Sequence, residues 1–117
     1  MSTTNYISSA IEWAQKKGFT QLKANHEDYE SPSQFHKADD ETPFIPDITA
    51  RKGDKKCYIE VATKTEDKGR MISKWKLLST LAEMKGGKLF LLAPRGHKAF
   101  AERLLKKYNL QAQLRSL

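Results

Sequence analysis

At 117 residues, the chain is long enough for one domain with a real core and too short for two, so we expect a single domain over residues 1–117. Ordinary proportions of hydrophobic (38%) and charged (30%) residues exclude a disordered chain. No apolar run approaches the roughly 20 residues of a membrane-spanning helix, and the polar N-terminus lacks a signal-peptide core. Because Cys57 is the only cysteine, we expect no internal disulfide and a cytoplasmic location.

The formal net charge of +7 favours a polyanionic partner, and nucleic acid is the obvious class. Six of the fourteen acidic residues lie within residues 26–41, so the rest of the chain is more basic than the total suggests. A generic solubilising surface would account for the same charge.

The first half of the chain predicts a helix followed by strands. Residues 5–17 place apolar side chains at helical spacing (Ile7, Ala10, Ile11 and Ala14), and Gly18 is a C-cap. Residues 19–25 alternate as a strand does, whereas residues 26–42 have neither period and are predicted to form a loop.

A β-hairpin is predicted from residues 46–51 and 58–64, with Gly53-Asp54 at its turn. Because successive side chains leave opposite faces of a strand, Tyr58, Glu60, Ala62 and Lys64 are expected to share one face of the second arm.

The second half predicts two further helices that alternate with two strands. The first helix covers residues 68–85, with Asp67 as N-cap, and is followed by an almost continuously apolar strand at 88–93. A helix at 97–108 and a short edge strand at 110–115 complete the chain. A helix between the third and fourth strands predicts a parallel crossover.

Two acidic residues stand out in the hairpin. Asp47 opens one arm, and Glu60 lies in the middle of an otherwise apolar strand, where a carboxylate is costly to bury unless something binds it. Neighbouring arms can bring both carboxylates to one cation. Mg²⁺ takes oxygen ligands of this kind, together with substrate phosphate.

The hairpin resembles the PD-(D/E)XK nuclease superfamily, which includes many restriction enzymes and archaeal Holliday-junction resolvases. The superfamily pattern is Pro-Asp, a variable gap, then Asp or Glu, any residue, and Lys. Here Pro46-Asp47 and Glu60 match, and Ala62 stands at the lysine position. We expect Lys64, one pleat repeat later, to replace the missing lysine, with Lys74 on the next helix as the second choice.

The predicted order of elements agrees with this resemblance. It implies an α/β fold with a restriction-endonuclease-like αβββαβ core, in which helices flank a mixed central sheet. A C-terminal helix and a short strand would be added to that core.

The resemblance further implies a Mg²⁺- or Mn²⁺-dependent endonuclease that hydrolyses phosphodiester bonds of DNA, with branched DNA as one candidate substrate. The metal ligands would be Asp47, Glu60, the main-chain carbonyl of Val61, and Glu12 on the first helix. Lys64 would stabilise the charge that develops during hydrolysis. As the only acid on that helix, Glu12 could equally be an ordinary exposed residue.

Basic residues on the two later helices are predicted to hold the nucleic-acid backbone without reading its sequence. They are Lys74, Lys76, Lys98, Arg103 and Lys106. Many nucleases of this kind cut as dimers, so a homodimer is implied by analogy.

Two other functions fit the same residues. Because Ala62 occupies the lysine position, the chain could be a degenerate member that binds nucleic acid or a protein without cutting. Alternatively, the two acids could be structural and pair with Arg51, Lys52 or Lys64 across the hairpin.

Overall fold

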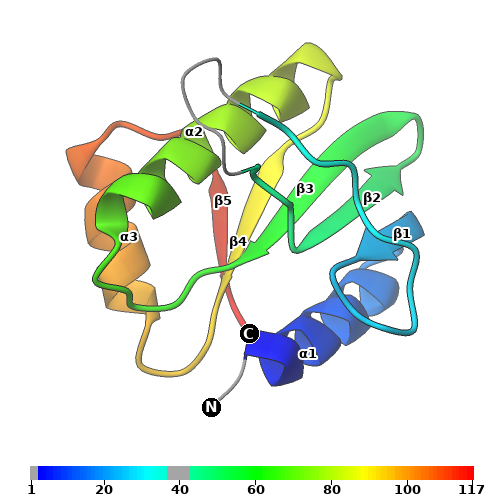
Figure 1. Ribbon diagram of the computed structural model, residues 1–117, viewed down its shortest axis with the longest axis horizontal. Helices are drawn as coiled ribbons and strands as arrows, with labels where there is room; N and C mark the ends of the chain where they lie inside the picture. The colour runs from blue at the N-terminus through cyan, green and yellow to red at the C-terminus, as the bar shows by residue number, and fades with distance from the viewer. Residues whose placement is uncertain (1–2, 37–42) are drawn as a thin grey trace.

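A five-stranded mixed sheet separates one helix from the other two in the computed structural model (Figure 1). The structure describes residues 3–36 and 43–117. In chain order, the elements are α1 (Thr3–Lys16), β1 (Thr20–Ala24), β2 (Ile48–Lys52), β3 (Lys55–Val61), α2 (Lys68–Met84), β4 (Leu89–Ala93), α3 (Lys98–Lys107) and β5 (Gln113–Ser116). The predicted α/β class and the order of its elements are therefore confirmed.

The strands lie side by side in chain order, β1-β2-β3-β4-β5. The first three form an antiparallel meander, and Gly53 closes the β2–β3 turn with a φ of +64°, a conformation that glycine adopts at little cost. β4 lies parallel to β3, and β5 lies parallel to β4. The predicted parallel crossover through α2 and the predicted edge position of the last strand are both confirmed.

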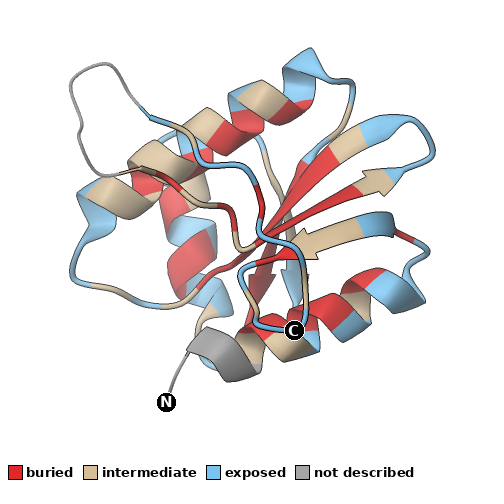
Figure 2. Cartoon of the chain, turned by 45° about the vertical axis from the view of Figure 1, so that its right-hand side comes forward, coloured by how far each residue is buried: buried red, intermediate tan, exposed pale blue. Residues whose placement is uncertain are grey.

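Each face of the sheet has its own hydrophobic cluster. α1 packs on the face that carries Ile59 and Val61, whereas α2 and α3 pack on the face that carries Tyr58 and Ala62. Figure 2 shows buried residues concentrated in the sheet and on the helix surfaces turned toward it. The predicted alternation of β3 is therefore confirmed, and Glu60 belongs to the face covered by α2.

Strand β3 ends earlier than predicted, at Val61. Extending the hairpin register places Pro46 opposite Val61, and proline has no N–H to donate to a continuing ladder. The chain then turns away, and the Lys64 N–H donates to Nδ1 of His97 at 2.9 Å. Lys64 is therefore not on the strand face where the sequence pattern placed it.

The long segment before the hairpin is irregular where the structure describes it. The Ala24 N–H donates to the carbonyl of Glu30, and Phe35 forms an isolated bridge with Phe44. The acids Asp39, Asp40 and Glu41 of the predicted loop lie outside the described residues. Within the described part of the chain, no helix is long and apolar enough to cross a membrane.

Gly87 allows β4 to approach the start of β3 very closely. An added Cβ would lie 1.7 Å from the carbonyl oxygen of Lys56, which is backbone and cannot move aside cheaply. We expect Gly87→Ala to lower the free energy of unfolding by about 3 kcal/mol or more through overpacking. Gly69→Ala is the matched control, because Gly69 lies inside α2 with open space around its Cα.

Gly69→Ala should raise the free energy of unfolding by up to about 1 kcal/mol, since alanine favours a helix over glycine. Urea denaturation of both variants measures the two changes. Equal effects of the two substitutions would contradict the close approach at Gly87.

A candidate acid–lysine site

The hairpin brings Asp47 and Glu60 together through two reciprocal hydrogen bonds. The main-chain N–H of Asp47 donates to Oε2 of Glu60 at 2.6 Å, and the N–H of Val61 donates to Oδ2 of Asp47 at 2.9 Å. Each carboxylate thus accepts from the backbone of the opposite arm. The predicted convergence of the two acids is confirmed.

Lys74 of α2 completes the arrangement, and we call these three residues the acid–lysine cluster. Its Nζ lies 2.7 Å from Oε1 of Glu60 and 3.9 Å from Oδ1 of Asp47. Glu60 is only 2% exposed, and the Lys74 side chain is 21% exposed. This ammonium group is the counter-charge that the buried glutamate requires.

Helix α2 is fixed at the end nearest the cluster. Oδ1 of Asp67 accepts from the N–H of Arg70, so the predicted N-cap is confirmed. The Arg70 guanidinium donates to the carbonyl of Pro43 at 2.8 Å and lies 4.1 Å from the centre of the Phe44 ring. These contacts tie α2 to the segment that leads into Asp47.

A shallow pocket of about 270 Å³ opens beside the cluster. It is lined by the three cluster residues, by Val61 at the end of β3, and by residues from the start of α2. A ligand can therefore reach the acids from solvent.

Burial favours the neutral forms of the two carboxyl groups, whereas the charge of Lys74 favours their ionised forms. Burial and the nearby negative charge of Asp47 raise the pKa of Glu60 to about 8, although Lys74 and hydrogen bonds favour its ionised form. Burial also raises the pKa of Asp47, against Lys74 and the Val61 N–H. For Lys74, burial alone would lower the pKa, but the two carboxylates outweigh it and raise the pKa.

The hydrogen-bond geometry describes the ionised form of Glu60, because both of its oxygens face donors. A protonated Glu60 would have to give up one of these contacts. With two carboxylates and one ammonium group, the ionised cluster carries one excess negative charge. Either a proton or a bound cation can neutralise it.

The donor set suits a hard divalent cation. Among the described residues, Oδ1 of Asp47 is the cluster oxygen without a hydrogen bond, and Val61 lies at the same pocket. The Lys74 ammonium stands between the two acids, where a divalent ion would bind. Within the described chain, no third His, Cys, Asp or Glu joins them.

Binding of Mn²⁺ should depend on pH, because below about pH 8 a proton competes with the divalent ion for the Glu60 carboxylate. Since burial raises the pKa of Glu60 to about 8, apparent affinity should rise roughly tenfold per unit between pH 6 and pH 8. Titration calorimetry with Mn²⁺ at several pH values measures the slope.

Glu60→Gln should remove most of this binding together with its pH dependence. The exposed residue Glu83, at the far end of α2, provides Glu83→Gln as the control, which should behave as the wild type does. A pH-independent affinity in the wild type would contradict proton–metal competition at Glu60.

Two predicted site residues lie elsewhere. Glu12 is exposed on α1, which packs on the sheet face opposite Glu60, so the structure does not place it with the other acids. Lys64 is exposed and does not line the pocket. The lysine beside the acids is Lys74, the second choice of the sequence prediction, which was also assigned to backbone binding.

The other four residues that were predicted to bind the nucleic-acid backbone lie apart from the acid–lysine cluster. Lys76, Lys98, Arg103 and Lys106 are exposed on α2 and α3, and Lys106 lies 4.0 Å from Glu102. The predicted structural pairing of the acids with Arg51, Lys52 or Lys64 is not observed, because Lys74 is their partner.

Two charged residues at the pocket were not predicted as site residues. Asp67 and Arg70 line it, and their spacing from Lys74, at one-turn intervals along a helix, was the available signal.

Comparisons with known proteins assign no family to this chain. No protein-family model, no curated protein and no solved structure matches it.

Proposed function

We propose that the protein is a metal-dependent endonuclease that hydrolyses phosphodiester bonds of DNA. The observation that carries this proposal is the acid–lysine cluster, in which two hydrogen-bonded carboxylates share one lysine at a pocket open to solvent. A carboxylate pair with a neighbouring amine suits phosphodiester hydrolysis. The sequence resemblance to PD-(D/E)XK nucleases supports the same reaction, with Lys74 in the role first expected of Lys64.

Asp47, Glu60 and the Val61 carbonyl would hold Mg²⁺ or Mn²⁺. When bound, such an ion activates water and neutralises phosphate charge. Lys74 must move off Oε1 of Glu60 as the cation enters, and its flexible four-carbon stem permits this. Its ammonium group is then available to stabilise negative charge on the phosphate as it develops.

A second function is favoured by a specific feature of the same cluster. Both oxygens of Glu60 already accept hydrogen bonds, and Lys74 supplies the charge that a metal would otherwise provide. A protein with such a self-neutralised site would bind nucleic acid without cutting it. In that case the net charge of +7 would provide salt-dependent affinity.

Incubation with supercoiled and branched DNA tests the proposal. We expect cleavage with Mg²⁺ or Mn²⁺ and none in EDTA. DNA binding measured in EDTA, combined with no cleavage under any divalent ion, would instead establish the non-cutting function.

A further inference from the structure

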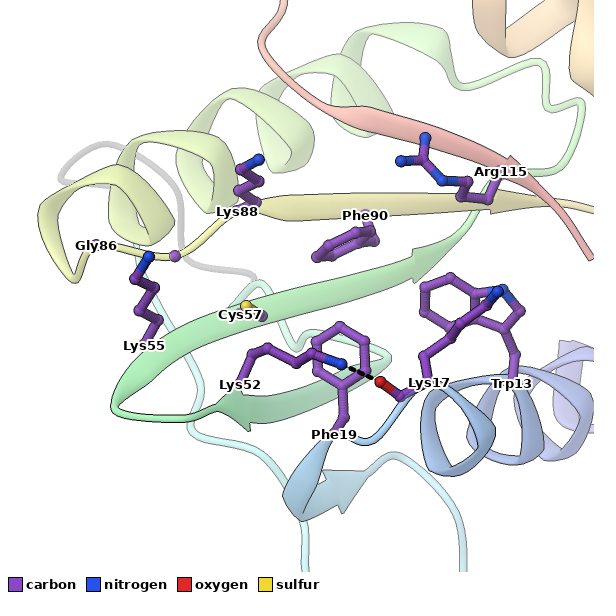
Figure 3. Close-up of a pocket in the computed structure, with 11 residues that line it drawn as sticks. Trp13, Lys17, Phe19, Lys52, Lys55, Cys57, Gly86, Lys88, Phe90 and Arg115 are labelled. Carbon is purple, nitrogen blue, oxygen red and sulfur yellow. Dashed lines mark hydrogen bonds between the residues drawn. The ribbon is translucent and has the colours of Figure 1, made fainter.

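A pocket of about 470 Å³ lies on the α1 side of the sheet, away from the acid–lysine cluster (Figure 3). We call it the Trp13 pocket. Cys57 is one of its lining residues. It lies on the face of β3 opposite Glu60. The volume of the pocket is within the range of ordinary ligand sites. A ligand in the Trp13 pocket would therefore be separate from the proposed nuclease site.

Three aromatic rings form one wall of the Trp13 pocket. Trp13 stacks on Phe19 with ring centroids 5.8 Å apart, and it lies 5.7 Å from Phe90. Phe19 and Phe90 meet edge to face at 5.4 Å. Phe19 is buried, but Trp13 and Phe90 remain partly exposed. Their rings are tilted by 55° to one another, so they form an angled apolar surface that is fixed by packing.

Positive charge surrounds these rings. Lys17, Lys55, Lys88 and Arg115 line the pocket, and none of the described residues that line it is acidic. Lys17, Lys55 and Lys88 have no ion-pair partner within the described chain. A fifth cation, Lys52, is already engaged, because its Nζ donates to the carbonyl of Lys17 and lies 5.0 Å from the Phe19 ring.

The cations surround the Trp13 pocket and do not converge on one point. Figure 3 shows Lys55 and Lys88 at one end, with Arg115 and Lys17 toward the other. The helix ends near the pocket are the C-terminal ends of α1 and α2, which do not attract phosphate. A free nucleotide needs a compact phosphate cradle, whereas a strand with successive phosphates suits charges spread around the rim.

We infer that the Trp13 pocket binds an unpaired base of single-stranded nucleic acid. The base stacks on Trp13 and packs against the tilted ring of Phe90, and the flanking phosphates contact Lys55, Lys88 and Arg115. Aromatic platforms inside basic grooves are how proteins hold single strands without reading sequence. A duplex keeps its bases stacked inside and cannot present one to the rings.

Fluorescence anisotropy in EDTA, with a labelled oligothymidylate of about ten nucleotides, tests this inference. We expect Trp13→Leu to weaken binding by about 5- to 150-fold, the range typical of losing the stack on one base. The paired substitution Lys55→Gln/Lys88→Gln should weaken binding and reduce its dependence on salt. Both of these lysines are exposed, so this second variant tests the site even if Trp13→Leu unfolds.

Arg95→Gln/Lys107→Gln is the matched control, because it removes the same charge from exposed positions just before and on α3, to which no binding role is assigned. An equal loss of binding in this control would move the strand to the α3 side and overturn the inference. So would equally tight binding of a duplex of the same length, or unchanged binding by a folded Trp13→Leu variant. Competition by thymidine monophosphate at equal nucleotide concentration would show a free-nucleotide site instead, and would also overturn it.

Absence of cleavage leaves this inference intact, since binding is measured without metal. Conversely, loss of binding in Trp13→Leu with intact Mn²⁺ binding would separate the two sites.

Discussion

If the protein is the proposed nuclease, Asp47→Asn and Glu60→Gln should each reduce metal-dependent DNA cleavage by about 100-fold or more, because each removes a proposed charged metal ligand. Both substitutions keep the size of the side chain. The amide at position 47 retains an oxygen that can accept from the N–H of Val61. The loss should therefore reflect chemistry and not a collapsed hairpin.

Glu83→Gln controls for a changed total charge and should cleave as the wild type does. Thermal unfolding of each variant confirms that it is folded under assay conditions. Equal cleavage by wild type, Asp47→Asn and Glu60→Gln would show that the activity comes from a contaminant, and the nuclease proposal would be withdrawn.

Lys74→Met should have the largest effect on stability. Removing the ammonium group leaves two carboxylates without their counter-charge, and breaking a buried ion pair typically costs about 3–5 kcal/mol. The same substitution should abolish cleavage if Lys74 stabilises the developing phosphate charge. Lys64→Met is the matched control and should change neither quantity, because Lys64 is exposed and lies outside the pocket.

The stability loss in Lys74→Met should grow as pH rises. Burial raises the pKa of both Glu60 and Asp47 above their ordinary values, so the folded state holds protons that the unfolded state releases. Stability from such groups is present at low pH and is lost as pH rises toward the folded pKa. In Lys74→Met, no ammonium group offsets the stability that is lost as the two carboxyl groups ionise.

Urea denaturation at pH 5 and pH 8 measures this difference. Adding Glu60→Gln to Lys74→Met should recover part of the stability at pH 8 without recovering cleavage, since it removes the uncompensated charge. A Lys74→Met variant as stable at pH 8 as at pH 5 would argue against an ion pair at this position.

Local sequence patterns predicted much of this fold because local chemistry determines them. The alternation along β3 assigned Tyr58 and Glu60 to one face, and Gly53 identified the turn that sets the hairpin register. Once that register is fixed, Asp47 must lie beside Glu60. The acid pair was therefore predictable before any tertiary contact was known.

The identity of the lysine was not predictable in the same way. Where β3 ends depends on Pro46, which lies just before the opposite strand, so Lys64 could not be placed from its own spacing. The partner of Glu60 depends on which side of α2 meets the sheet. Glu12 could not be placed for a similar reason. The apolar periodicity of the first helix shows that it is amphipathic but not which sheet face it covers.

The reciprocal hydrogen bonds between Asp47 and Glu60 have a consequence for folding as well as for chemistry. A slip of one residue in the hairpin would send the Glu60 side chain toward α1, among apolar side chains and away from Lys74. In such a misaligned hairpin, the Glu60 carboxylate would be buried among apolar side chains without a counter-charge. The carboxylate that is proposed to hold the metal therefore also penalises incorrect strand alignment, and a neutral residue in its place would tolerate such a slip.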